Sequence, residues 1–436
     1  MNMNKIYYLL ALLFIPMSSA FSQDVLTAQE AVTIAMENNF DILLTKKDVI
    51  IAKENATYGN AGILPNLTAN FTQSNSNQNS KQTQITGEVR ELENAKNNSM
   101  NYGVSLGWTI FDGFGMFARY EKLNQLKSRG DLELKSIILT TVGDVLNMYY
   151  TIVLEENLLH TIDSSIAISN DRLKTAENRF QIGKASKLEV LNVQVNLNED
   201  QSLRFRKMET IANLKTELNR LLARDLTIDF DVEDQFQFNE NLEINALLEE
   251  ATNQNIELQL IKLDKRLAEL EQKDVRSKRL PVVRLNSGYN FSSSESSLGF
   301  VAQSNARGLT YGVTASLNIF DGFNQRRSER VAKQMVEKAS IQIERSKELI
   351  NATILKAYQS YMTNISLTKL EERNERIAKQ NLNITLDKYK IGTISAVEFR
   401  DAQENYVNAV SRLKEANYQA KLSEVGLKEL VGNLDF

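Results

Sequence analysis

The pentapeptide IFDGF occurs twice in the sequence, at Ile110–Phe114 and at Ile319–Phe323. The two copies lie 319 − 110 = 209 residues apart, and the same shift superimposes Ile182-Gly183 on Ile391-Gly392. A shift shared by such distant segments indicates that the chain carries two copies of one structural unit.

The two copies differ in length at one place. Upstream of the pentapeptide, Leu64-Pro65 aligns with Leu280-Pro281 at a shift of 280 − 64 = 216, so the first copy is longer there by 216 − 209 = 7 residues. Loops tolerate insertions at little cost, so we predict a surface loop in the polar stretch Ser74–Ser99. We assign the two repeats to residues 24–228 and 229–436.

The amino terminus has the layout of a secretory signal peptide. Lys5 precedes an apolar run, Ile6–Ile15, and small residues of a cleavage site follow. The run is too short to span a membrane as a helix, so we assign residues 1–23 to a signal peptide that is cleaved after Ala20 or Gln23. The mature protein is therefore expected outside the cytoplasm.

The composition excludes several kinds of site. The chain of 436 residues has no cysteine, which excludes disulfides, thiolate metal sites and a cysteine nucleophile. Its formal net charge of −4 does not favour nucleic acid, which usually binds a basic face. The one histidine, His160, lies in a predicted long helix, where a surface role is favoured over catalysis. We predict no catalytic residue, cofactor or metal; a hydrolase built from carboxylates alone stays open.

Each repeat contains two segments in which apolar and polar residues alternate. We predict strands at about 64–75 and 100–111, and at about 280–292 and 308–320. The alternation is clearest before the first pentapeptide, where one face carries Tyr102, Val104, Leu106, Trp108 and Ile110. Long strands with one apolar face are typical of transmembrane β-strands and also of soluble hairpins with one buried face.

Four such strands behind a signal peptide favour the membrane interpretation. Aromatic residues at the strand ends, Trp108, Phe111 and Phe320, suit the interface between membrane and water. A sheet in lipid cannot leave its edges open, because no water is present to bind the edge N–H and C=O groups. Four strands are too few to close a barrel, since single-chain barrels start at about eight. We therefore expect several copies of the chain to share one barrel.

The pentapeptide predicts a corner between a strand and a helix. Asp112 and Asp321 can cap the helix that follows through its backbone N–H groups. Gly113 and Gly322 let the chain turn where a Cβ would obstruct it. We interpret these residues as structural rather than catalytic.

Helices make up the rest of each repeat. A shorter helical stretch comes first, at Ala28–Gly59 and at Ile244–Lys278. Long helices follow the strands, at about 114–180, 187–222, 324–390 and 396–431. A helix of about 60 residues extends roughly 90 Å, too long for a compact domain. Each repeat is therefore a helix, a β-hairpin and a long helical hairpin whose break contains a glycine.

With this layout the chain resembles the TolC-type outer membrane efflux proteins. The resemblance rests on the duplicated order, the FDG word at each strand end and the helical break, in which an acidic residue follows the glycine by six positions, at Glu189 and Glu398. It covers nearly all of the mature chain. The family pattern usually has a second glycine after FDG, where this chain has Phe114 and Phe323.

The resemblance implies a mainly α fold with transmembrane β-strands, assembled as a homotrimer. Three chains with four strands each would form a 12-strand β-barrel in the outer membrane of a Gram-negative bacterium. A periplasmic α-helical barrel would continue it. This implies a passive channel of a tripartite efflux or type I secretion system, which docks on a periplasmic membrane-fusion (adaptor) protein and an inner-membrane transporter. The alternative is an exported coiled-coil interaction scaffold without a pore.

The resemblance also implies two functional sites. The turns between the long helices would dock on the adaptor: Gly183, Lys184, Ala185, Ser186, Gly392, Thr393, Ile394 and Ser395. Beside the second turn, Glu398 and Asp401 lie on one helix face and would form an acidic ring, the periplasmic gate. Tyr389 and Glu189 would link the helices in the closed state. Ile394 stands where the family has an arginine, which implies fewer links. Taken alone, the turns also fit ordinary helix ends, and the acidic pair fits a solvated face.

Overall fold

The computed structural model describes residues 25–233, 235–239, 242–297 and 301–433. The predicted signal peptide lies outside these described residues. The chain forms two compact units, a helical unit and a sheet unit. The helical unit contains the described parts of Met1–Leu43, Ile138–Asn253 and Ala352–Phe436, and the sheet unit contains those of Leu44–Ile137 and Gln254–Asn351.

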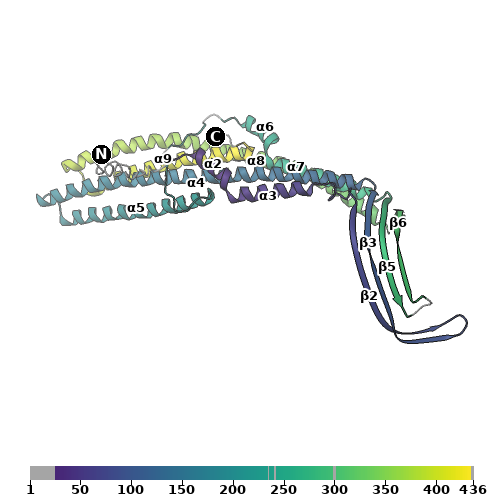
Figure 1. Cartoon of the computed structure of the whole chain (residues 1–436). Helices are drawn as coiled ribbons and strands as arrows, with labels where there is room; N and C mark the ends of the chain where they lie inside the picture. Colours follow the sequence, from purple (N-terminus) through teal and green to yellow (C-terminus); the bar gives the residue numbers. More distant parts are fainter. Residues whose placement is uncertain (1–24, 234, 240–241, 298–300, 434–436) are drawn as a thin grey trace, which may run out of the picture. The chain divides into compact units, whose positions relative to one another are not determined.

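The order of helices and strands repeats along the chain (Figure 1). The first copy contains β1 (Val25–Leu26), α2 (Ala28–Asn38), α3 (Phe40–Asn55), β2 (Asn66–Thr83), β3 (Val89–Phe111), α4 (Gly115–Gln181) and α5 (Lys187–Leu221). The second copy contains β4 (Asp231–Val232), α6 (Ile244–Gln254), α7 (Ile256–Ser277), β5 (Val282–Ser296), β6 (Gln303–Ser316), α8 (Asn324–Ile391) and α9 (Ala396–Val431).

The first helical stretch of each copy is interrupted, although the sequence predicted one continuous stretch. The break falls at Asn39 in the first copy and at Asn255 in the second. The Asn39 side-chain oxygen accepts the N–H of Ile42 at 3.3 Å, and that of Asn255 accepts the N–H of Leu258 at 2.9 Å. An asparagine that binds these free N–H groups starts a new helix, which explains why the stretch divides.

The core of the helical unit lies among α2, α4, α5 and α9. Its buried apolar side chains include Ala35, Val145, Ile152, Leu218 and Val425. Helix α4 contains a window of mean hydropathy 1.5, long and apolar enough to cross a membrane by length and composition, but 56% of that window is buried within the chain. Burial of this kind is typical of a core helix.

A short parallel pair of strands joins the starts of the two copies in the helical unit. Val25 of β1 lies opposite Asp231 of β4. Between them, the buried Tyr149 hydroxyl donates to the carbonyl of Leu26 at 3.0 Å and accepts the N–H of Glu233 at 3.1 Å. The first residues of both repeats therefore contact the same α4 side chain, that of Tyr149.

The sheet unit contains one antiparallel sheet in the order β2-β3-β5-β6. β3 and β5 join the two hairpins, with Tyr102 opposite Phe291 and their rings stacked at 4.8 Å. Within the described residues, β2 and β6 each pair on one side only. The sheet of one chain therefore has two open edges.

The first hairpin contains more strand than predicted. β2 and β3 have 18 and 23 residues, against 15 and 14 in β5 and β6. Most of the polar stretch Ser74–Ser99, predicted as a loop, is therefore strand, since a hairpin can pair its backbone groups whatever its side chains are.

β6 ends at Ser316, short of the predicted end near residue 320. Ser316 lies opposite Val282, and the preceding Pro281 has no N–H to continue the pairing.

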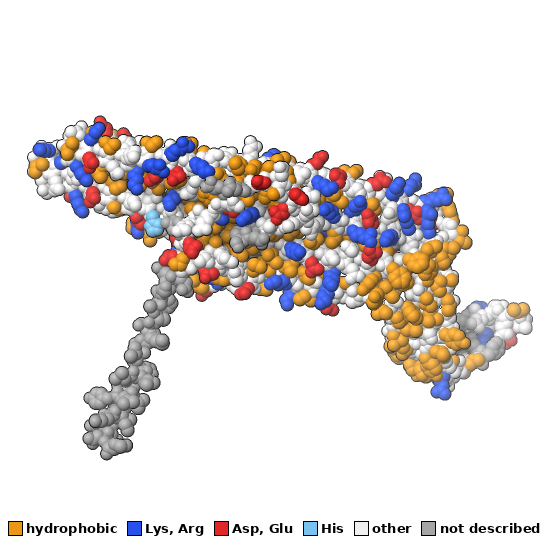
Figure 2. Space-filling model, turned by 90° about the horizontal axis from the view of Figure 1, so that it is seen from above, with side chains coloured by type: hydrophobic (Ala, Val, Ile, Leu, Met, Phe, Trp, Pro, Cys, Tyr) orange, Lys and Arg blue, Asp and Glu red, His pale blue; other side chains and the backbone are white. Residues whose placement is uncertain are grey.

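The cross-strand register gives the sheet one apolar and one polar face. One apolar row crosses all four strands at Ala69, Val104, Tyr289 and Leu309. The next row, on the opposite face, consists of Asn70, Gly103, Asn290 and Gly308. The apolar side chains are exposed, and Figure 2 shows hydrophobic side chains gathered over the sheet. An apolar face of this size indicates contact with lipid or another apolar surface.

The polar face requires small residues. A Cβ at Gly103 would lie 2.5 Å from the carbonyl oxygen of Tyr289, and one at Gly107 would lie 2.7 Å from the Asn66 side-chain oxygen. This face lines a hollow of about 430 Å³ together with Thr68 and Ser105. The glycines therefore permit close approach of neighbouring strands on this side.

The two pentapeptides lie at the strand-to-helix corners. Asp112 accepts the N–H of Met116 at 3.0 Å, and Asp321 accepts the N–H of Gln325 at 2.7 Å, which is the geometry of a helix cap. Gly113 has φ 74°, and a Cβ there would lie 2.1 Å from a carbonyl oxygen of α7. The capping carboxylate of Asp112 therefore stabilises the corner, and Gly113 allows the chain to pass close to α7 where a side chain would clash.

The second glycine position of the family pattern is strained in this chain. Phe114 has φ 72° and Phe323 has φ 65°, a left-handed conformation that costs a non-glycine residue about 1 kcal/mol or more. Each ring packs edge-on against the phenylalanine three residues earlier, with centroids 5.1 Å apart in the first corner and 5.4 Å in the second. These contacts offset part of the strain.

Candidate functional site at the helical tips

The candidate site lies in the helical unit, where the long helices turn. Gly183 and Gly392 have φ 76° and 81°, which ends α4 and α8. The Ser186 hydroxyl accepts an N–H of α5, and the Ser395 hydroxyl accepts an N–H of α9, each at 3.2 Å. Of the predicted tip residues, all but the half-buried Ala185 and Ile394 are exposed: Gly183, Lys184, Ser186, Gly392, Thr393 and Ser395.

Both tips expose apolar side chains at equivalent positions. The shift of 209 pairs Ile182 with Ile391 and Leu188 with Val397. These side chains are 67%, 76%, 66% and 69% exposed, respectively. Isolated apolar residues are common on surfaces, but a matched set around two polar turns is typical of a surface that a partner covers.

The structure brings together Tyr389 and Glu189 from α8 and α5. The Tyr389 hydroxyl donates to a Glu189 carboxylate oxygen at 3.4 Å. The Arg179 Nη1 lies 3.6 Å from the same oxygen, and its guanidinium lies 5.5 Å from the centre of the Tyr389 ring. Arg179 of α4 thus supplies a guanidinium to this cluster, although Ile394 replaces the arginine implied by the resemblance.

Glu398 and Asp401 do not join that cluster. Both are exposed at the start of α9. A Glu398 carboxylate oxygen accepts the N–H of Ser395 at 3.4 Å, which completes a capping box. Glu398 occupies the same place in its helix as Glu189, since 398 − 189 = 209. The first carboxylate therefore links helices, whereas the second caps its own helix.

A second, buried polar cluster joins both copies below the tips. Arg400 of α9 approaches the Asp200 carboxylate of α5 at 3.3 Å, and Asp200 accepts the Ser169 hydroxyl of α4 at 2.7 Å. The Gln403 amide of α9 donates to the Ser165 and Ser169 hydroxyls of α4, at 3.0 Å each. The side chains of Arg400 and Asp200 are only 16% and 11% exposed. This cluster ties α9 to both long helices of the first copy.

The sequence analysis missed this cluster, although the sequence contains a signal for it. In α5 the buried positions recur at steps of three and four through Val190, Val193 and Leu197, and the next is Asp200. A charged residue in an apolar series is a marker of a specific pairing between helices. The partner on α9 carries no comparable local signal.

Burial is the main influence on the ionisable groups of the site. It raises the pKa of the Tyr389 hydroxyl, and the charge of Glu189 adds to this, so the hydroxyl remains a donor. It lowers the pKa of the Arg172 guanidinium, and the neighbouring charge of Arg400 acts in the same direction. For Arg400, burial opposes the charge, but the hydrogen bond and charge of Asp200 raise its pKa overall.

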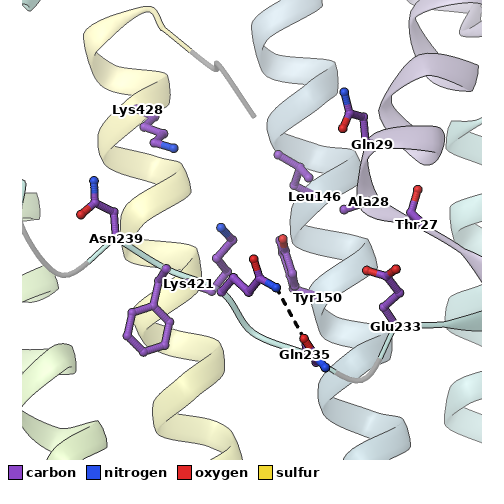
Figure 3. Close-up of a pocket in the computed structure, with 12 residues that line it drawn as sticks. Thr27, Ala28, Gln29, Leu146, Tyr150, Glu233, Gln235, Asn239, Lys421 and Lys428 are labelled. Atoms are coloured by element: carbon purple, nitrogen blue, oxygen red, sulfur yellow. Dashed lines mark hydrogen bonds between the residues drawn. The ribbon is translucent and has the colours of Figure 1, made fainter.

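A cavity of about 650 Å³ lies in the helical unit away from the tips (Figure 3). It lies between α9, α4 and the segment that follows β4. Its lysines are paired: Lys421 and Lys428 each lie 3.1 Å from a carboxylate oxygen of Glu424, and Lys421 also lies over the Tyr150 ring. Among the described residues, no group of His, Asp or Glu is placed to hold a metal ion. The tips therefore remain the better candidate site.

The fold is similar to that of solved outer membrane channels. The solved structure of the CmeC outer membrane channel of Campylobacter jejuni matches with a TM-score of 0.77 and 16% identity, over 93% of this chain and 85% of that one. The outer membrane protein TolC of Vibrio cholerae is 22% identical over 92% of this chain and 89% of its own length. TolC of Salmonella enteritidis is 21% identical over 79% and 72%, respectively.

The sequence model of the family described as "Outer membrane efflux protein" matches residues 31–222 and 247–433. The chain therefore belongs to the outer membrane efflux protein family. It is an outer membrane efflux channel of a Gram-negative bacterium with a large periplasmic helical part. The two matched segments correspond to the two repeats, so both copies carry the family pattern. The family consists of transport conduits rather than enzymes.

Proposed function

We propose that three copies of this chain form one closed channel, which docks by its helical tips on a periplasmic adaptor and is gated beside those tips. The observation that supports it best is the open-edged sheet with an exposed apolar face. Neither open edge can face lipid, because its N–H and C=O groups would lack partners. Pairing of β2 with β6 of a neighbouring copy satisfies both edges, and three chains with four strands each give a 12-strand barrel. The conduit itself performs no chemistry.

Outer membrane lipid contacts the apolar face in this assembly, and the small polar face lines the lumen. Trp108 suits the interfacial position, since its indole N–H donates to the carbonyl of Ile63 at 2.8 Å while its ring stays on the apolar face. Phe111 and Phe320 lie at the same end of the strands as the corners. Aromatic residues at this level anchor a barrel against vertical movement.

The adaptor would bind the tip residues together with the exposed apolar side chains beside them. Three chains would also bring Glu398 and Asp401 together as a ring of six carboxylates that attracts cations. The cluster of Tyr389, Glu189 and Arg179 would hold the closed state. The inner-membrane transporter, reached through the adaptor, would select the substrate.

Cysteine pairs across the open edges test the trimer, because the chain has no native cysteine. Thr72→Cys on β2 would be combined with Thr310→Cys or Thr314→Cys on β6, so that more than one register is sampled. Disulfide-linked trimers on a non-reducing gel are expected. The pair Asn101→Cys with Ser292→Cys is the control, since these residues face each other within one chain and should yield linked monomers.

Single-channel recording in a planar bilayer tests the pore. We expect cation-preferring steps that a multivalent cation reduces from one side. Glu398→Gln with Asp401→Asn should weaken both the cation preference and the block. Unchanged ion selectivity would remove the acidic ring from the proposal, and a protein found only in the soluble periplasm would instead be the scaffold without a pore.

A further inference from the structure

The two tips of one chain enclose a groove with an excess of positive charge. It measures about 480 Å³ and receives side chains from α4, α5 and α9. Three arginines line it, Arg172, Arg179 and Arg400, against one carboxylate, that of Glu189. The capping serines of α5 and α9 also line it, so the positive ends of two helix dipoles lie at its wall.

Besides Arg179, whose buried Nη1 also lacks a hydrogen-bond partner among the described residues, Arg172 is the unsatisfied member of the groove. It is 2% exposed, and its Nε and Nη1 atoms are buried without a hydrogen-bond partner within the described part of the chain. The nearby carboxylates are engaged elsewhere: Asp200 binds Arg400 and Ser169, and Glu189 lies beside Arg179 and Tyr389. A buried guanidinium without an anion is strongly unfavourable, so this site is built to receive negative charge.

The walls of the groove suit a side chain better than a free ion. Leu188 and Val397 line it at equivalent positions of the two repeats, and both are largely exposed. An inorganic ion would leave these apolar side chains in water, whereas a helical segment covers them while it inserts a carboxylate. The unused Nε and Nη1 of Arg172 lie on different edges of its guanidinium, so each can donate one charge-assisted hydrogen bond to a carboxylate oxygen.

We propose that this groove binds a carboxylate side chain, flanked by an apolar residue, from the helical hairpin of the periplasmic adaptor. The inference rests on the proposed docking at the tips and adds the chemistry of the partner. Arg172 acts as the anchor, and the flanking apolar residue packs on Leu188 and Val397. The excess charge of the groove would also speed encounter with an acidic partner and make it sensitive to salt.

Fluorescence anisotropy with two labelled helical peptides of about 16 residues tests the site. One peptide carries a central Leu-Glu pair, and the other differs only by Gln in place of Glu. The full chain, purified as its oligomer in detergent, should bind the Glu peptide at least about tenfold more tightly. Arg172→Met should reduce this preference to less than about twofold, and Arg172→Gln should do the same if the first variant fails to fold. Arg376→Met is the matched control, since its side chain on α8 is 68% exposed and remote from the groove.

Equal affinities of the two peptides for the unmodified protein, including no measurable binding of either, overturn the proposal. So does a preference that survives the loss of Arg172. If a carboxylate of a neighbouring copy already occupies the groove, the peptides will bind equally and Arg172→Met will lower the thermal midpoint of the oligomer, which also overturns it. Docking on the adaptor is measured separately, by cross-linking from Lys184→Cys, and conduction is measured by single-channel recording. A negative result in the peptide experiment therefore leaves those two proposals standing.

Discussion

Replacing Arg400 with methionine should both destabilise the helical unit and open the channel. Arg400 and Asp200 are 16% and 11% exposed, and the three contacts between them measure 3.3 to 3.4 Å. Removing one partner of a buried ion pair costs about 3–5 kcal/mol, because the other charge remains buried. These contacts are long and Ser169 still binds Asp200, so we expect a value near the lower end, about 3 kcal/mol.

The effect on gating depends on whether the Arg400–Asp200 ion pair forms in the closed channel, in the open channel or in both. If the contact between α9 and α5 exists only in the closed state, a loss of about 3 kcal/mol shifts the closed-to-open equilibrium by roughly 150-fold. The assay is open probability in planar bilayers, with the thermal midpoint measured on the same preparations. Asp200→Asn and the double variant complete a double-mutant cycle, in which the double variant should recover at least half of the loss because no buried charge is left unpaired.

Two results would refute the reasoning. Additive effects of Arg400→Met and Asp200→Asn would mean that the two side chains do not act as a pair. A lowered thermal midpoint with open probability within about twofold of the unmodified channel would mean that the pair stabilises the open and closed states equally. In that case the cluster is structural and the gate depends on other contacts.

Three further substitutions test other parts of the structure. Gly113→Ala should destabilise the sheet unit by about 2 kcal/mol or more in chemical denaturation, because of its positive φ and the 2.1 Å approach of a carbonyl oxygen, whereas Gly426→Ala, with open space around it, should be neutral or stabilising. Burial raises the pKa of the Glu429 carboxyl, so this group stabilises the folded state only while it is protonated, and that stability is lost as pH rises. Glu429→Gln should therefore raise the thermal midpoint at pH 7. The gain should disappear towards about pH 4, where the carboxyl is protonated in both states. Tyr389→Phe keeps the stacking on the next helix but loses the 3.4 Å hydrogen bond, so open probability should rise by no more than about fivefold, and no change would remove that bond from the gate.

The sequence could predict the elements because their signals are local. The alternation before Phe111, the capping Asp112 and Asp321, and the absence of proline from the long helices each act within a few residues. The predicted long helices, such as about 396–431, agree closely with α9 at Ala396–Val431. The errors occurred where a local signal was weak: the break at Asn39, and the polar hairpin, whose strands pair through their backbones although their side chains do not alternate clearly.

By itself, the sequence determined the duplication, the four alternating strands, the long helices and the positions of the tips. Only the tertiary structure decided that Arg179 lies beside Glu189 and Tyr389, that Asp200 meets Arg400, and that Arg172 is buried without a partner. Periodicity specifies which face of each helix is buried, but the rotation and axial position of one long helix against another depend on packing along their whole length. Residues about 200 positions apart therefore meet through contacts that no local pattern encodes.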